Sequence, residues 1–132
     1  MLWITPIVAA VLTAAYIRLA FNVIGLRRSN KVSLGAGGVD ALERAIRAHG
    51  NFSEYVPLGL ILMLALEWNK APGLLVAALG ALLVAGRVIH AKGIQETGTF
   101  KNRILGMKLT FASLGLLALA NVGWLAYAAL RG

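Results

Sequence analysis

Four apolar runs separated by short polar segments are the feature that most limits how this sequence can fold. They cover residues 2–26, 56–66, 74–89 and 104–130. A helix needs about 20 predominantly apolar residues to cross the hydrocarbon of a bilayer. The first run is too long for a signal-peptide core, and no small-residue cleavage site with a polar mature domain follows it. We therefore expect it to be retained as a helix of an integral membrane protein.

The composition excludes the other broad classes of protein. Hydrophobic residues make up 59% of the 132 positions and charged residues 14%. A small domain leaves much of its surface exposed, so a water-soluble fold of this length could not hide so many apolar side chains. The same bias argues against an intrinsically disordered chain. Because the sequence has no cysteine, disulfides, thiolate metal sites and a cysteine nucleophile are excluded as well. We expect no metal site.

The pattern of runs and turns predicts a single all-α domain over residues 1–132. We expect helices at about 2–26, 41–68, 73–91 and 103–130, packed as a left-handed bundle of four transmembrane helices. Asp40 is a plausible N-cap for the second helix. Pro57 suggests a kink within it.

Small residues recur at every fourth position of the predicted third helix (Gly73, Ala77, Ala81 and Ala85). Small side chains at this spacing allow two helix backbones to approach closely. The alternative is that alanine is simply common in membrane helices.

The placement of lysine and arginine predicts the orientation in the membrane. Most of the basic residues lie in or beside the first and third polar segments (Arg27, Arg28, Lys31, Arg44 and Arg47; Lys92, Lys101, Arg103 and Lys108). The second segment contains only Lys70. Basic loops usually face the cytoplasm, so we expect loops one and three there and both termini outside, as in a bacterial inner membrane. The excess of 13 basic over 5 acidic residues then reflects these loops, and we expect no nucleic-acid partner.

A polar stripe in the predicted second helix needs a further explanation. Arg47, Asn51, Glu54 and Tyr55 lie at i, i+4, i+7 and i+8, so they share one helical face. The stripe leads directly into an apolar span without an intervening loop. Ionisable groups at such a depth are costly and usually face a partner or a cavity.

Two interpretations of this stripe are open. In the first, Glu54 pairs with Arg47, Arg87 or Arg103 in a structural network, His90 is a structural donor, and Arg27 and Arg103 are membrane-surface anchors. In the second, the cationic groups, which outnumber the acids, form a site for an anionic and partly zwitterionic ligand. Arginine suits this role because its planar fork binds carboxylates bidentately. An arginine where a helix begins, such as Arg103, could also stabilise a thiolate.

The second-helix segment resembles the signature of the MAPEG family, the membrane-associated proteins in eicosanoid and glutathione metabolism. The matching residues are Glu43-Arg44-x-x-Arg47-Ala48-His49-x-Asn51-x-x-Glu54-Tyr55-x-Pro57. This pattern is especially similar to that of leukotriene C4 synthase, the microsomal glutathione transferases and bacterial relatives. Shorter matches are the Arg27-Arg28 pair, Gly86-Arg87-x-x-His90 and Arg103. The chain departs from the family pattern at Ile94, where several members have tyrosine, and at Gly50, where some have arginine.

The resemblance implies a homotrimer that binds glutathione between neighbouring subunits. Carried over by position, the residues that would hold glutathione are Arg27, Arg47, His49, Asn51, Glu54, Tyr55, Arg87 and His90. Arg27 and Arg47 would bind carboxylates, and Glu54 would bind the γ-glutamyl amine. Arg103 would be the catalytic residue that stabilises the thiolate.

These expectations lead to a main hypothesis and two rivals. The main hypothesis is a glutathione-dependent transferase or peroxidase whose hydrophobic second substrate enters from the lipid bilayer. The first rival is a non-catalytic lipid-binding or scaffold protein of the same fold. The second is a small exporter of cationic drugs, which is disfavoured because such a transporter needs an acid in its first helix, where this chain has Arg18.

Overall fold

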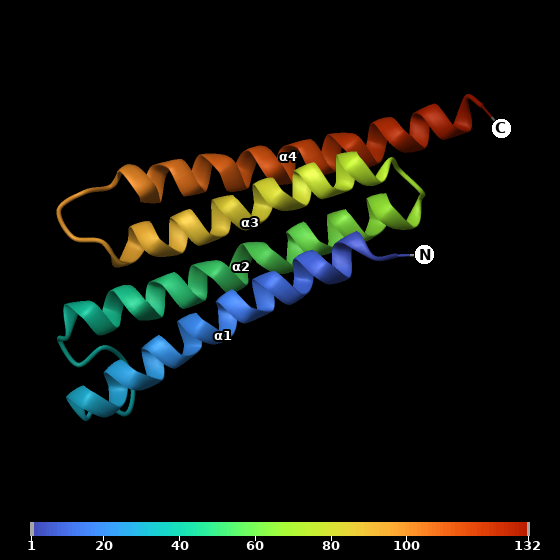
Figure 1. Ribbon diagram of the computed structural model, residues 1–132. Coiled ribbons are helices and arrows are strands. Elements are labelled where there is room, and N and C mark those ends of the chain that lie inside the picture. The colour runs from blue at the N-terminus through green and yellow to red at the C-terminus, as the bar shows by residue number, and fades with distance from the viewer. Residues whose placement is uncertain (1, 132) are drawn as a thin grey trace.

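The computed structural model describes residues 2–131 as a bundle of four long helices, α1 (Ile4–Asn30), α2 (Asp40–Trp68), α3 (Gly73–Gln95) and α4 (Lys101–Ala129). No strand occurs within these residues. The helices run alternately up and down, so the loops at 31–39 and 96–100 lie at one end of the bundle (Figure 1). The α2–α3 turn and both termini lie at the other end. The predicted all-α four-helix bundle is confirmed.

Three of the helices, α1, α3 and α4, are long and apolar enough to cross a membrane on their own. α2 does not meet that criterion because its N-terminal half is polar. α2 lies inside the bundle, since both α2 and α3 contact all three other helices, whereas α1 and α4 do not contact each other. Its polar half is therefore covered partly by protein. Within the stripe, Asn51 is buried and Arg47 is exposed.

The helices extend further than the apolar runs indicated. α1 continues past residue 26 to Asn30, where Lys31 adopts a left-handed conformation (φ 55°) and ends the helix. Arg27 and Arg28 lie in this last turn, where positive charge is favourable to the helix dipole. α3 likewise continues past residue 91 to Gln95. Hydropathy marks the extent of the membrane core, and these helices continue through the polar interface beyond it.

Two local predictions within α2 need correction or comment. Asp40 is not an N-cap: it is the first residue of α2, and Val39 precedes the helix without a side-chain cap. An acid in the first turn is nevertheless favourable to the dipole. α2 runs as one continuous helix through Pro57.

α3 and α4 approach each other through glycines. A Cβ atom added to Gly106 would overlap the backbone of His90, and one added to Gly93 would overlap the backbone of Arg103. One added to Gly86 would lie 2.8 Å from the amide nitrogen of Thr110. Only glycine allows this contact, and it brings the backbones that carry His90 and Arg103 together.

The small-residue stripe predicted on the third helix is not this contact. Gly73 and Ala81 of that stripe are exposed in the subunit. The close approach instead involves glycines nearer the C-terminal end of α3. The stripe of Gly73, Ala77, Ala81 and Ala85 therefore does not form the close contact between α3 and α4.

Glu67, near the C-terminal end of α2, caps the N-terminus of α1. One carboxylate oxygen accepts hydrogen bonds from the amides of Trp3 and Ile4, each at 2.8 Å, and the other accepts from Thr5 at 2.7 Å. Amides in the first turn of a helix have no partner within it, and a carboxylate there also offsets the dipole. This contact ties the start of α1 to the α2–α3 turn.

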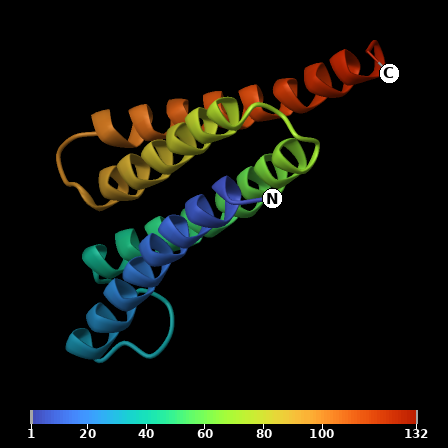
Figure 2. The same ribbon diagram turned by 45° about the vertical axis from the view of Figure 1, so that its right-hand side comes forward.

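The two hairpins, α1–α2 and α3–α4, diverge toward the end of the bundle that carries the two loops (Figure 2). At the opposite end the helices converge around the α2–α3 turn. The polar N-terminal half of α2 lies at the diverging end.

Candidate functional site

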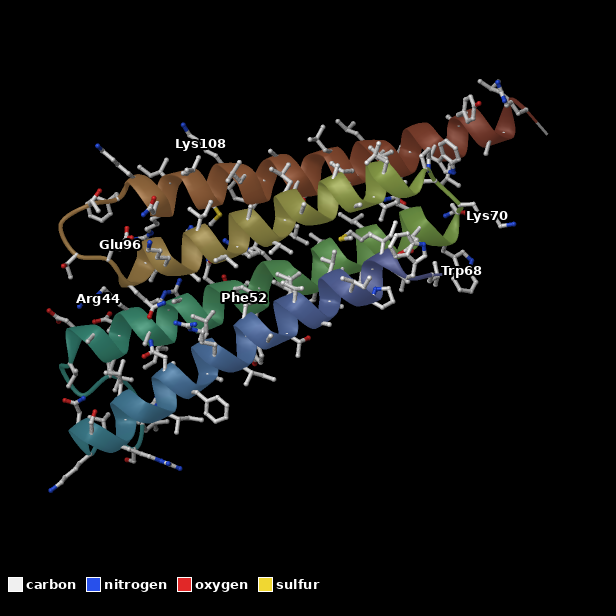
Figure 3. The ribbon with its side chains drawn as sticks, in the orientation of Figure 1. Arg44, Phe52, Trp68, Lys70, Glu96 and Lys108 are labelled. Atoms are coloured by element: carbon white, nitrogen blue, oxygen red, sulfur yellow. The ribbon has the colours of Figure 1, made fainter. Side chains whose placement is uncertain are left out.

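A cavity of about 790 Å³ lies at the loop end of the bundle, between α2, α3, α4 and the 96–100 loop. Four of the residues predicted to form the site line it: Arg47 and Asn51 from α2, His90 from α3 and Arg103 from α4. Figure 3 shows Arg44 on α2 and Glu96 just after α3, two further lining residues, at this same end. Three helices thus contribute polar groups to one space.

Basic and acidic side chains both line the cavity. Three arginines line it, Arg44, Arg47 and Arg103. The acids that line it come from the first turn of α2, namely Asp40 and Glu43, or from Glu96 after α3. The lining therefore contains acids as well as the cations that the sequence emphasised. A ligand that carries both carboxylates and an amine would find complementary groups here.

His90 is held by a hydrogen bond from its ring to the backbone of α4. Its Nδ1 lies 2.8 Å from the carbonyl oxygen of Arg103. A carbonyl can only accept, so Nδ1 carries the hydrogen, and Nε2 is an acceptor when the ring is neutral. The bond fixes the imidazole beside the backbone of Arg103, where the glycine contact between α3 and α4 has brought the two helices together.

Arg87 lies behind the cavity and positions Asn51. Its side chain is 1% exposed. Nη1 donates to the backbone oxygen of Asn51 at 3.2 Å and to the side-chain oxygen of Asn51 at 3.1 Å, while Nε donates to Thr110 at 3.0 Å. The guanidinium carbon also lies 5.0 Å from the ring centre of Tyr55. Because the Asn51 carbonyl is occupied, its amide nitrogen is the group left to donate to a ligand.

Glu54 and Tyr55 belong to this cluster but do not line the cavity. Glu54 is exposed, and its carboxylate accepts a long hydrogen bond, 3.4 Å, from the Asn51 amide. Tyr55 packs edge-on against Phe111, with ring centres 5.8 Å apart. The hydrogen bond to Glu54 comes from an amide rather than from an arginine, so the structural network considered above does not take the predicted form.

Arg27 and His49 lie apart from the cavity. Arg27 donates to the carbonyl of Gly35 at 2.9 Å and lines a different hollow beside the C-terminal end of α1. The ring of His49 packs on that of Tyr16, with centres 4.5 Å apart, and its buried Nε2 has no hydrogen-bond partner within residues 2–131. Within the chain, these two side chains and Arg103 do not surround the same space.

A family model for the MAPEG family matches residues 5–123, which include all but the two ends of the bundle. The chain belongs to the MAPEG family. It is also 39% identical over 117 residues to the protein named "Inner membrane protein YecN" of Escherichia coli strain K12, a match that covers 88% of each chain. The protein of the same name from Escherichia coli O6:H1 matches to the same extent. The resemblance inferred from the second-helix motif is confirmed.

For a MAPEG protein, several contacts at this site carry no signal in the sequence. The partnership of Arg87 with Thr110 joins residues 23 positions apart, and nothing marks Thr110 as polar support in an apolar run. Ile94, Phe100, Ile104 and Met107 give the cavity its apolar wall, and of these Ile104 and Met107 lie in an apolar run that the sequence marks only as a membrane helix. The glycines at 86, 93 and 106 were the available signal, because glycine is otherwise costly in a helix. Within residues 2–131 there is no cluster of three or more His, Asp or Glu side chains that could hold a metal ion.

Proposed function

We propose that this MAPEG protein is a glutathione-dependent transferase or peroxidase that acts on lipophilic electrophiles or hydroperoxides. The observation that carries the proposal is the cavity in which Arg47 and Asn51 lie opposite His90 and Arg103. It combines cationic donors, the amide of Asn51 and an apolar wall, next to helices that are apolar enough to lie in lipid. A peptide thiol with two carboxylates and an amine matches this combination.

Each part of glutathione has a counterpart among these residues. Arg47 binds a carboxylate through its guanidinium fork, and the Asn51 amide donates to the peptide. Glu54 does not line the cavity, but its carboxylate accepts a hydrogen bond from Asn51, which does, and from that position it binds the γ-glutamyl amine. Arg103, at the start of α4, stabilises the thiolate by its charge, as a preorganised donor stabilises an oxyanion. Arg87 does not touch the ligand; it holds the side chains of Asn51 and Tyr55 in position.

The proposed reactions balance with glutathione, the second substrate and water. The glutathione S–H loses its proton to water, the thiolate attacks the electrophilic carbon, an S–C bond forms and the leaving group departs with its electron pair. With a hydroperoxide, the thiolate attacks the terminal oxygen, the O–O bond breaks and the alcohol is released after protonation. A second glutathione then reduces the sulfenic product, giving glutathione disulfide and water.

Arg27 and His49 take part through a neighbouring subunit in this proposal. Both lie away from the cavity of their own chain, so they meet the ligand of an adjacent copy in a homotrimer. The ligand site is completed only when subunits associate.

The chain lies in the inner membrane, as the name of its YecN relatives states for them. We place the loops at 31–39 and 96–100 in the cytoplasm because most basic residues flank them, with both termini outside. Glutathione enters from the cytoplasm, and the second substrate reaches the apolar wall at Ile104 and Met107 from the bilayer.

The test is glutathione conjugation to 1-chloro-2,4-dinitrobenzene by the full chain in mild detergent. Wild type and the control Lys108→Ala, whose side chain points away from the bundle (Figure 3), are expected to be equally active. Arg103→Ala is expected to lose at least tenfold in kcat, because removing one stabilising donor costs about a hundredfold or more in other enzymes. Equal activity of Arg103→Ala and wild type removes Arg103 from the mechanism. No activity in any variant, together with no binding of glutathione, favours the non-catalytic lipid-binding or scaffold role.

A further inference from the structure

A second cavity lies between α1 and α3 and shares only Glu96 with the candidate site. Its volume is about 600 Å³. Arg18 and Asn22 line it from α1, and Lys92 lines it from α3. The buried ring of Phe52, labelled on α2 in Figure 3, forms part of the floor. Neither the motif of the second helix nor the proposed glutathione chemistry accounts for this cavity.

The cavity contains two cations without matching acids. Arg18 is the charged residue in the apolar run of α1, and both Arg18 and Lys92 are exposed. Among residues 2–131, Glu96 is the acid that lines this cavity. Both oxygens of its carboxylate accept hydrogen bonds from the Asn102 amide, each at 2.9 Å. A charge within an apolar span is costly unless it meets a partner. The acid that lines this cavity already accepts hydrogen bonds from Asn102.

The lining of the cavity combines polar and apolar side chains. At the loop end, the Asn22 amide donates to Gln95 at 2.8 Å and bridges α1 to α3. Leu19, Phe52 and Val88 supply the apolar part of the lining, beside Arg18 and Lys92. A ligand that fits must carry both an anionic group and a hydrocarbon chain.

We propose that this cavity binds an anionic phospholipid from the leaflet on the loop side. The phosphodiester lies between Arg18 and Lys92, since a guanidinium matches phosphate bidentately and basic pockets between membrane helices hold anionic headgroups. One acyl chain lies along Leu19, Phe52 and Val88. The bilayer supplies this ligand at the depth where the cavity opens. The site is independent of glutathione binding and stands whether or not the chain is an enzyme.

The experiment uses the full chain purified in detergent and delipidated. Native mass spectrometry and thermal melting are recorded with phosphatidylglycerol, with phosphatidylcholine and with inorganic phosphate. Wild type is compared with the double variant Arg18→Leu with Lys92→Met, and with the control Lys108→Met, which removes an exposed cation outside the cavity. A charge-keeping pair, Arg18→Lys with Lys92→Arg, tests the site without removing its charge.

Wild type and the Lys108→Met control are expected to retain phosphatidylglycerol over phosphatidylcholine by a factor on the order of ten, and to melt at a higher temperature in its presence. The double variant is expected to lose both effects, and the charge-keeping pair to keep the preference. An unchanged preference in the double variant overturns the proposal, as does its loss in the charge-keeping pair. Stabilisation by inorganic phosphate equal to that by phosphatidylglycerol shows a free-anion site instead. A changed oligomeric state in the double variant, with lipid preference intact, shows that a second copy covers the cavity.

Discussion

Arg87 donates from a single nitrogen to both the backbone oxygen and the side-chain oxygen of Asn51, at 3.2 and 3.1 Å. The first bond joins the Arg87 side chain to the backbone of α2, and the second fixes the orientation of the Asn51 side-chain amide. One buried guanidinium on α3 thereby joins helix packing to the geometry of the candidate site on α2. Its nitrogen Nη2 is buried and has no hydrogen-bond partner within residues 2–131.

Arg87→Met is expected to weaken glutathione binding and to destabilise the bundle. The substitution leaves the side-chain oxygens of Asn51 and Thr110 without their buried donor, which costs about 1–3 kcal/mol. The KM for glutathione is expected to rise more than tenfold while kcat changes less, because Asn51 is free to rotate. Steady-state kinetics and thermal melting measure the two effects.

Thr110→Val is the matched control for that prediction. It removes the Nε contact of Arg87 and the hydrogen bond from the Thr110 hydroxyl to the Gly106 carbonyl, and it leaves both bonds from Arg87 to Asn51. It is expected to lower the melting temperature with little change in KM. If Thr110→Val raises KM as much as Arg87→Met does, Arg87 supports the fold and does not position Asn51.

Gly106→Ala is expected to separate α3 from α4 at the site. The added methyl group overlaps the backbone of His90, and overpacking of this kind costs about 1–3 kcal/mol or more. The same substitution at Gly115, where a Cβ meets nothing within 4 Å, is expected to leave stability unchanged or raise it by up to about 1 kcal/mol, because alanine favours helix. Melting temperatures in one detergent compare the two variants. Equal behaviour of both would contradict the glycine-mediated contact.

Glu67→Gln is expected to destabilise the start of α1. A carboxylate accepts from three amides here, whereas an amide side chain has one acceptor oxygen and places an NH₂ group against N–H donors. The expected loss is about 1–2 kcal/mol, the range for losing a helix cap. Hydrogen exchange at the amides of Ile4 and Thr5 reports it locally. Glu43→Gln, an exposed acid in the first turn of α2, is the control and is expected to leave these amides protected.

The sequence was sufficient for the bundle because hydropathy and helix periodicity reflect local physical requirements. The four apolar runs located all four helices, and the motif from Glu43 to Pro57 identified the family. Helix ends were missed where polar residues continue a helix beyond the membrane core, as at Arg27–Asn30 and at Lys92–Gln95.

The candidate site could be predicted only in part, because its remaining contacts depend on which helices meet. The spacing of Arg47 and Asn51 places them on one face, but it does not reveal that Arg87 occupies the Asn51 carbonyl. The distance between the Arg27 side chain and the cavity likewise depends on the position of α1. The Glu67 cap joins residues 62 to 64 positions apart, and no local pattern marks such a contact.

Calorimetric titration of glutathione into the purified chain tests the central claim most directly. Wild type is expected to release or absorb heat on saturable binding, and Arg47→Ala is expected to bind about tenfold to a hundredfold more weakly, because a charge-assisted contact to a carboxylate contributes about 1.5–3 kcal/mol. Lys108→Ala is expected to bind as wild type does. Equal affinity of wild type and Arg47→Ala for glutathione would contradict a glutathione site in the cavity between α2, α3 and α4. The absence of any binding by wild type would contradict it as well.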